Sequence, residues 1–276
     1  MANKNITITD VVEGMPFSEY LKIKAMNGST LKHGKRSMQA IKWHYDNPED
    51  NDTPSKILGR YVHSKILEPE TVQANYFVTE HKRSTKEFKG EQKDNLGKQP
   101  IASKDHMAAQ LMFDSVMNNT SAKNLLIGGR RELTVLWRYK GHPMKCRIDL
   151  LHDTPHIVDL KTAYDPRPFA FGSNAHKLGY TWSAALYSAV VEVIASKSPA
   201  FDFVVVASTP PYESAVFTVP ADIMECARGD VFYLMDQYLQ CRKKNQFPGI
   251  DSDYLQLPSY AMPEIDDSDV EMVDTL

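Results

Sequence analysis

The sequence predicts one globular α/β domain built on a mixed sheet. Size and composition are the first observation, because 276 residues that are 42% hydrophobic and 10% aromatic can bury one sizeable core. The second is that segments with helical spacing of apolar residues flank several short, β-branched runs. The third is that three of these runs follow one another between residues 132 and 163, separated only by short turns.

The N-terminal part of the chain is predicted to be mainly helical. Ser29 is a capping residue, and residues 29–45, which it opens, place apolar side chains at steps of three and four. A second helix is predicted over residues 55–67, beginning at Ser55. A short strand is predicted over residues 75–79.

The middle of the chain carries the three consecutive strands. Residues 80–100 are polar and charged and contain glycine, which predicts a mobile insertion, and a helix is expected over residues 103–117. Strands are then predicted over residues 132–139, 144–152 and 156–163. Because the turns between them are short, an antiparallel meander is the natural arrangement.

The C-terminal part alternates helices and strands again. One long helix is predicted over residues 176–195 and a second over residues 221–244, with strands over residues 201–208 and 214–219 between them. Residues 261–276 are acidic and are predicted to form a disordered tail, so residues 1–260 are expected to make up the single domain.

Charge is unevenly distributed along the chain. The net charge is −3, but residues 251–276 hold eight acidic and no basic residues, and the rest of the chain carries 32 Lys and Arg against 27 Asp and Glu, a formal +5. Basic clusters at residues 32–36 and 81–89 could meet the phosphates of a nucleic acid. The alternative is that each cluster is an ordinary solvated face.

Several classes of protein are not expected. No run of about 18 apolar residues suggests a membrane span, and the first ten residues lack a secretion signal, so a cytoplasmic protein without a membrane partner is predicted. Cys146, Cys226 and Cys241 are odd in number and far apart, which favours neither a disulfide framework nor a zinc site.

Two acidic residues and a lysine interrupt the apolar strands. Side chains alternate along a strand, so Asp159 and Lys161 should share one face, while the short turn should bring Asp149 opposite Asp159. Two facing carboxylates repel each other unless something compensates them. A hard cation such as Mg²⁺ does so, and with a nearby ammonium it suits phosphate chemistry. The alternative is an ordinary ion pair between Asp159 and Lys161.

The motifs, taken in order, resemble a known superfamily. "RELTVLW", "CRIDLL", "HIVDLKTA" and a helix with "GYTWSAALY" resemble the PD-(D/E)XK nucleases. "GRYVHSKILEPE" is similar to a signature of RecE-type nucleases (exonuclease VIII) and their phage relatives, and its histidine element is shared with RecB-type nuclease domains. With "MNGSTLKHGKRSM" and "FPG…LPSYA", the resemblance covers about residues 15–262. It implies a restriction-endonuclease-like core, a central sheet flanked by helices.

The resemblance also implies a metal site. It carries over to His63, Asp149, Asp159 and the backbone carbonyl of Leu160 as ligands of Mg²⁺, or of Mn²⁺, with Lys161 as the catalytic lysine. The two aspartates count among the catalytic residues. Acidic residues on the preceding strand can contribute in such nucleases, sometimes through water, which makes Glu132 a further candidate; the alternative is a solvent-facing strand residue.

One position departs from the pattern of these exonucleases. Their long helix usually carries Tyr-x-x-Gln-x-x-x-Tyr, and here Tyr180 and Tyr187 flank Ser183 in place of the glutamine. Because serine is shorter, slower chemistry, a water in the place of the amide or an altered substrate is possible. All three are candidates for DNA binding, although the tyrosines could equally be core aromatics. The candidates for phosphate contact are Arg147, Lys35, Arg36 and His176.

The resemblance implies a metal-dependent deoxyribonuclease, most simply a 5′ to 3′ exonuclease on double-stranded DNA ends in phage-type recombination or repair. The alternatives are a structure-specific endonuclease and a DNA end-binding protein with little turnover. A homo-oligomeric ring around DNA, a single-strand annealing protein as partner and a bacterial or phage-infected cell are the implied context.

Overall fold

The computed structural model describes residues 4–48 and 52–251. The predicted acidic tail, residues 261–276, lies outside the described residues. The division of the chain into one domain and a tail therefore stays a prediction.

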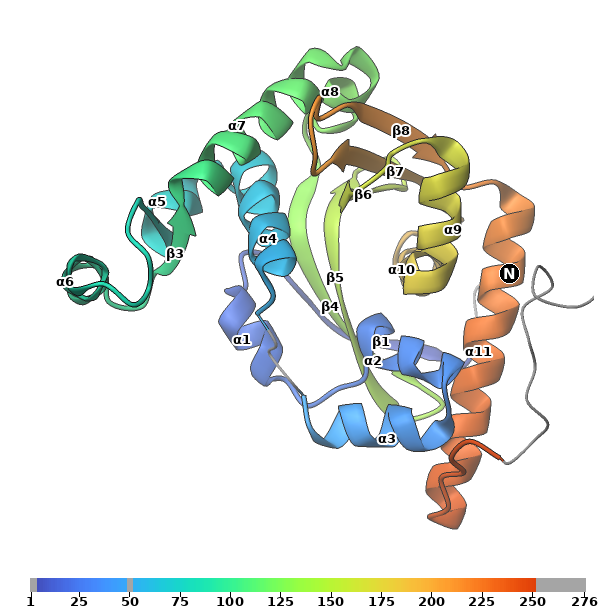
Figure 1. The fold of residues 1–276 in the computed structure, drawn as a ribbon. Helices are drawn as coiled ribbons and strands as arrows, with labels where there is room; N and C mark the ends of the chain where they lie inside the picture. The colour runs from blue at the N-terminus through green and yellow to red at the C-terminus, as the bar shows by residue number, and fades with distance from the viewer. Residues whose placement is uncertain (1–3, 49–51, 252–276) are drawn as a thin grey trace, which may run out of the picture.

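A six-stranded mixed sheet forms the centre of the structure, as the sequence predicts (Figure 1). Its strand order is β1-β4-β5-β6-β7-β8, and every neighbouring pair is antiparallel except β6 and β7. The strands are β1 (Ile6–Val12), β4 (Arg130–Tyr139), β5 (His142–His152), β6 (His156–Ala163), β7 (Ala200–Ala207) and β8 (Ser214–Thr218). The predicted meander is β4, β5 and β6, whereas β1 is an edge strand that the sequence analysis missed.

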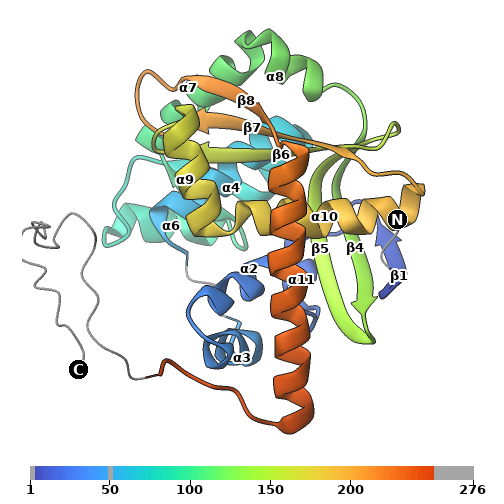
Figure 2. The same ribbon diagram turned by 90° about the vertical axis from the view of Figure 1, so that its right-hand side faces the viewer.

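Helices cover both faces of the sheet. On one face lies α10 (Tyr180–Ala195), which is apolar around most of its circumference and therefore buried, and α11 (Ala221–Lys244) packs across it (Figure 2). On the other face, α4 (Pro54–Leu67), α7 (Ser103–Asn118) and α8 (Thr120–Leu125) bury the opposite side chains of β5, β6 and β7. The fold is thus an α/β sandwich of helices around one mixed sheet.

The prediction of one helix over residues 29–45 is wrong. The segment forms α2 (Gly28–Leu31), the 3-10 helix η1 (Lys32–Lys35) and α3 (Met38–Asp46), after a short α1 (Phe17–Lys22). Ser37 is extended and its Oγ accepts a hydrogen bond from the Ala40 amide at 3.0 Å, so a new helix begins there. Gly34 packs against Leu234 of α11, where a Cβ would lie 2.6 Å from the leucine Cδ2, so the chain turns tightly beneath α11.

The long helix predicted over residues 176–195 is broken. It is divided into α9 (Pro168–Leu178) and α10, which are bent by 72° relative to each other. Gly179, at the break, has a φ of +74°, which ends α9 with a left-handed residue. Within the described part of the chain, no single helix has the length and hydropathy of a membrane span; α9 and α10 reach them only as this bent pair.

Residues 80–100 have more regular structure than the predicted mobile insertion. After η2 (Pro69–Thr71) and α5 (Val72–Asn75), β2 (Tyr76–Thr79) pairs in parallel with β3 (Gln99–Ala102), and α6 (Lys86–Asp94) lies between them. Figure 1 shows this small unit projecting beyond α4 and α7. The predicted helix 103–117 and strand 75–79 are confirmed within a residue or two.

The pairing of β5 with β6 is short and positions the site. Leu150 pairs with Val158, Leu151 with Ile157, and the ladder does not continue beyond Leu150. The two strands therefore separate at Asp149 and Asp159. β6 continues alongside β7, and α9 and α10 supply the crossover that this parallel pair requires.

Candidate metal centre

Asp149 and Asp159 are buried where β5 and β6 separate. Their side chains are on neighbouring strands, and the Leu160 amide donates a hydrogen bond of 2.8 Å to Asp149 Oδ2. Burial raises the pKa of both carboxyl groups, that of Asp159 to about 6, because it disfavours the charged form more than nearby positive charges favour it. The predicted proximity of the two aspartates is present in the structure.

Lys161 supplies the positive charge closest to Asp159. Its ammonium forms an ion pair with Asp159 Oδ2, donates to the Leu160 carbonyl at 3.3 Å and lies 5.3 Å from the centre of the Tyr180 ring. The two aspartates raise the pKa of Lys161 above its ordinary value, even though burial acts in the opposite direction. The lysine is therefore charged at neutral pH.

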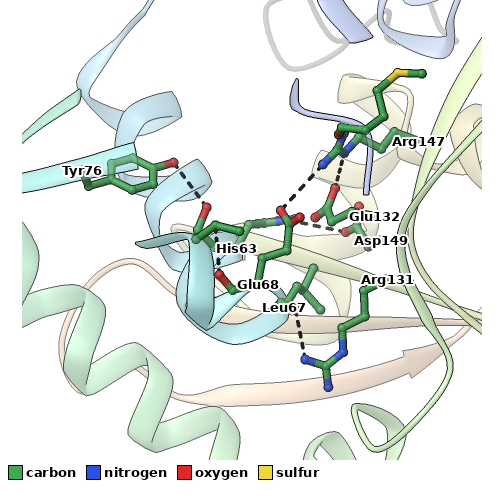
Figure 3. Close-up of polar contacts among 11 residues, drawn as sticks. His63, Leu67, Glu68, Tyr76, Arg131, Glu132, Arg147 and Asp149 are labelled. Atoms are coloured by element: carbon green, nitrogen blue, oxygen red, sulfur yellow. Dashed lines mark hydrogen bonds and ion pairs between the residues drawn. The ribbon is translucent and has the colours of Figure 1, made fainter. Parts of the chain in front are cut away.

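His63, on α4, lies next to the two buried aspartates. Close packing of α4 on β6 is possible because Gly59 faces Thr162, where a Cβ would lie 3.4 Å from the threonine Oγ1. One turn later, His63 Nδ1 lies 3.7 Å from Asp149 Oδ2 (Figure 3). Burial and the charge of Lys161 lower the pKa of His63 to about 4, so its ring is neutral at pH 7. A neutral imidazole is the form that binds metals.

Glu132 lies at an irregular point of β4. Its φ of +48° is left-handed, a conformation that residues other than glycine seldom adopt. The pairs Arg131 with Leu150 and Leu133 with Ile148 flank it, so Glu132 is opposite Asp149. Burial and the charge of Asp149 raise the pKa of Glu132 to about 8. It is a buried residue of the site rather than a solvent-facing strand residue.

The donor atoms of these residues fit a divalent cation. Among the described residues, His63, Glu132 and Asp149 each offer one ligand atom, and the three atoms lie within 4.8 Å of one another. Carboxylate oxygens with one imidazole nitrogen suit Mg²⁺ or Mn²⁺, and a cation would offset the repulsion between the acidic groups. Asp159 is outside this group and is paired with Lys161, while the Leu160 carbonyl lies beside both His63 and Lys161.

Three of the predicted DNA contacts lie at the junction of η1 and α9. The Lys35 ammonium donates to the His176 carbonyl and lies 4.8 Å from the Trp182 ring, so it joins the two elements. Arg36 and the His176 side chain are exposed. Their role in binding DNA stays a prediction.

Tyr180, Ser183 and Tyr187, the positions of the exonuclease pattern in α10, lie between the site and the core. The Tyr180 ring contacts Lys161 and the aromatic residues Phe171 and Phe203, and burial and the charge of Asp159 raise the pKa of Tyr187. Ser183 Oγ is close to α2, since a Cβ on Gly28 would lie 2.7 Å from it. The small serine therefore permits close packing of α2 on α10, where a longer side chain would not fit unchanged.

Arg147 is not in the position of a phosphate contact. Its side chain is 9% exposed and is paired with Glu132, with the Met15 carbonyl at 2.6 Å and with Glu68 Oε2 at 3.6 Å (Figure 3). Glu68 is a residue of this site that sequence reasoning did not single out, although it stands in the quoted "LEPE". Pro69 ends α4 after Leu67, which turns Glu68 toward Arg147.

The family of the chain follows from its sequence match. Residues 24–257 match the PDDEXK-like domain of unknown function DUF3799. The chain belongs to the DUF3799 family. The match includes every predicted ligand of the metal site, and it confirms the resemblance to the PD-(D/E)XK superfamily at the level of the fold. The finer resemblance to RecE-type exonucleases stays a prediction.

The DUF3799 chain also resembles a solved structure. A crystal structure of a protein described as a "putative exonuclease" from Eubacterium rectale superimposes with a TM-score of 0.64 at 15% sequence identity. The similarity covers 89% of the DUF3799 chain and 96% of the other. At this identity the match concerns the fold alone. None of the curated proteins matches the sequence.

Proposed function

We propose that this DUF3799 protein is a metal-dependent deoxyribonuclease that degrades double-stranded DNA from its ends, in the 5′ to 3′ direction. The observation that carries the proposal is the grouping of His63, Glu132 and Asp149 beside an Asp159–Lys161 ion pair, at the separation of β5 and β6. A merely structural ion pair needs neither the histidine nor the two further carboxylates. The E. rectale protein described as a candidate exonuclease supports the choice of reaction class.

Each residue of the site has a chemical task in this proposal. His63, Glu132 and Asp149 would hold Mg²⁺, with Mn²⁺ as a substitute and with Asp159 and the Leu160 carbonyl beside them. When bound, the cation supplies positive charge to the phosphate and makes water more acidic. Lys161 is charged and hydrogen-bonded to the Leu160 carbonyl, so its ammonium can orient a water or stabilise charge that develops on the phosphate.

The wider context is proposed on the same basis. Lys35, Arg36 and His176 would contact the DNA backbone, and a homo-oligomeric ring would keep the enzyme on its substrate. A single-strand annealing protein would act on the product, in the cytoplasm of a bacterial or phage-infected cell. A DNA end-binding protein with little turnover is the second candidate, because Ser183 replaces the expected glutamine and packs against α2. A structure-specific endonuclease is the third.

One experiment separates these functions. The purified chain is incubated with linear duplex DNA, labelled at either the 5′ or the 3′ end, and with covalently closed circular duplex, in Mg²⁺, Mn²⁺ or chelator. The proposal expects early release of the 5′ label, no attack on the circle and no reaction in chelator. Cleavage of the circle would indicate the endonuclease, and retention of linear DNA without degradation would indicate the end-binding protein. Asp159→Asn is the control for a contaminating nuclease.

A further inference from the structure

We propose that Arg147 is a positioning residue of the metal centre, which holds the Glu132 carboxylate in place for a divalent cation. The inference rests on the proposed function, because it requires that a cation binds at His63, Glu132 and Asp149. It assigns to Arg147 a role inside the protein instead of the DNA contact expected from sequence.

The strands bring Arg147 next to Glu132. Glu132 is opposite Asp149 on the neighbouring strand, and Arg147 precedes Asp149 by two residues, so it projects from the same face as a diagonal neighbour of Glu132. The Arg147 Nε and Glu132 Oε2 form an ion pair in which both side chains are almost fully buried. A buried carboxylate and a buried guanidinium each need this partner, since removing either one leaves an unpaired charge.

Glu132 needs an external restraint. Its left-handed backbone, with a φ of +48°, is strained and persists only where the surrounding structure enforces it. Without a partner, its carboxylate would be repelled by Asp149 and Glu68, which both act on its charge. The ion pair with Arg147 opposes that repulsion and leaves the other carboxylate oxygen available to a cation.

Arg147 is itself held from three directions. The guanidinium donates to the Met15 carbonyl at 2.6 Å, lies 3.6 Å from Glu68 Oε2 and sits 5.8 Å from the centre of the Phe17 ring. The planar guanidinium presents several donors in a fixed geometry, which lets it contact Glu132, Glu68 and Met15 together, and a lysine ammonium does not reproduce that geometry. The site residue Glu132 is thereby joined to the turn after α4 and to the segment before α1.

The test measures cation affinity without DNA. Mn²⁺ is titrated calorimetrically into the chelator-treated full chain, into Arg147→Met and into Arg147→Lys. We expect both variants to bind Mn²⁺ about 10- to 100-fold more weakly, the usual loss when a group that orients a metal ligand is removed. Arg147→Lys serves as the conservative variant if Arg147→Met does not fold, as judged by circular dichroism.

Lys145→Met is the matched control. Lys145 is a buried cation on the same strand, and its ammonium donates to the carbonyls of Tyr20 at 2.7 Å and Ile23 at 2.8 Å. It therefore ties the same N-terminal segment to β5 without contacting a carboxylate of the site. We expect its Mn²⁺ affinity to stay within about twofold of the parent. An equal loss in Lys145→Met and Arg147→Met would overturn the proposal in favour of general tethering.

A double-mutant cycle isolates the contact with Glu132. In a Glu132→Gln background, Arg147→Lys should change Mn²⁺ affinity less than about twofold, because the contact that it disturbs is already altered. Additive losses would overturn the role assigned to Arg147. Unchanged affinity in Arg147→Met and Arg147→Lys would do the same while leaving the metal-dependent function intact, whereas failure of the parent chain to bind Mn²⁺ would remove both.

Discussion

At the scale of single residues, the site is a balance between burial and charge. Asp149, Asp159 and Glu132 are buried close together, and burial raises the pKa of each, while Lys161 and Arg147 act in the opposite direction. In the metal-free protein the Asp159–Lys161 pair and the Glu132–Arg147 contact hold the arrangement. Burial keeps the Glu132 carboxyl largely protonated below its pKa of about 8, and a bound cation would favour its ionised form. Three predictions belong at this scale.

Removing one carboxylate charge should separate activity from stability. Asp149→Asn or Asp159→Asn is expected to lower the rate of DNA cleavage by roughly 10³-fold or more, because each removes charge that the cation needs. Without metal, Asp149→Asn should be as stable as the parent or slightly more so, since repulsion is relieved. Asp159→Asn should be less stable, because it leaves the buried Lys161 without its ion-pair partner. Asp153→Asn, an exposed carboxylate in the turn between β5 and β6, is the control. Full activity in either site variant would remove the metal assignment.

Lys161 should act on chemistry more than on affinity. In Lys161→Ala, single-turnover cleavage is expected to slow by about 10²-fold or more, because the ammonium is used at the reacting phosphate. Binding of linear duplex in chelator should weaken by less than about threefold, as for the exposed Lys197→Ala. If turnover is unchanged and only binding falls, Lys161 is a phosphate anchor.

Glu132 should make metal-free stability depend on pH. Its folded pKa of about 8 lies above the 4.5 expected when unfolded, so its stabilising contribution is complete below pH 4.5 and is lost as the pH rises to about 8. Compared with Glu132→Gln, the parent should lose about 1–2 kcal/mol of unfolding free energy between pH 6.5 and 8. Denaturant unfolding of both proteins measures this difference. A constant difference across that range would show that Glu132 is ionised throughout.

At the scale of helices and strands, breaks in regular structure shape the site. The break at Gly179 turns α9 away from α10. Before Pro69, α4 ends at Leu67, after Tyr61 and Val62 have entered the core. Because β5 and β6 separate, the Leu160 amide donates to the Asp149 side chain and not to the β5 backbone.

Two glycines allow a matched test of the break in the α9–α10 helix pair. Gly179→Ala should lower the free energy of unfolding by about 1 kcal/mol or more, because its φ is +74° and the new Cβ would lie 3.2 Å from Lys32 Cβ. Gly229→Ala, inside α11 with no atom near the added Cβ, should raise it by roughly 0.5–1 kcal/mol. Equal effects of the two substitutions would contradict the role of Gly179 as a left-handed helix end.

At the scale of the whole molecule, charge is divided between the body and the acidic C-terminal residues. The eight carboxylates of residues 251–276 oppose a body of formal charge +5 and could compete with DNA for its basic surface. At about 0.15 M salt the Debye length is roughly 8 Å, so such competition should be confined to low salt.

Shortening the chain tests this competition. A chain ending after Met262 lacks six of the eight carboxylates and should bind linear duplex about 3- to 10-fold more tightly at 0.05 M salt, with the difference shrinking as salt rises. Fluorescence anisotropy in chelator measures both chains. Equal affinities at low salt would show that these residues only add solubility.

Much of the fold and of the site could be predicted from residues that are close together in the sequence. Strand alternation placed Asp159 and Lys161 on one face, and the short turn brought Asp149 close. The helix predicted over about residues 221–244 is α11. His63 and the catalytic role of Lys161 were predicted from the motif resemblance, which carries information on spatial proximity that spacing alone lacks. These features depend on residues that are close together in the sequence, or on motifs whose residues are known to lie together in the resembling family.

Only the tertiary structure decided how the site is held together. Arg147 was predicted to contact phosphate because the sequence shows its charge. The sequence does not show that Glu132, Glu68 and Met15 surround it. The helix predicted over residues 29–45 is divided at the Ser37 cap, and Gly34, just before it, packs under α11, some 200 residues away in the chain. Local propensity is set by neighbours along the chain, whereas burial, pairing and pKa are set by neighbours in space.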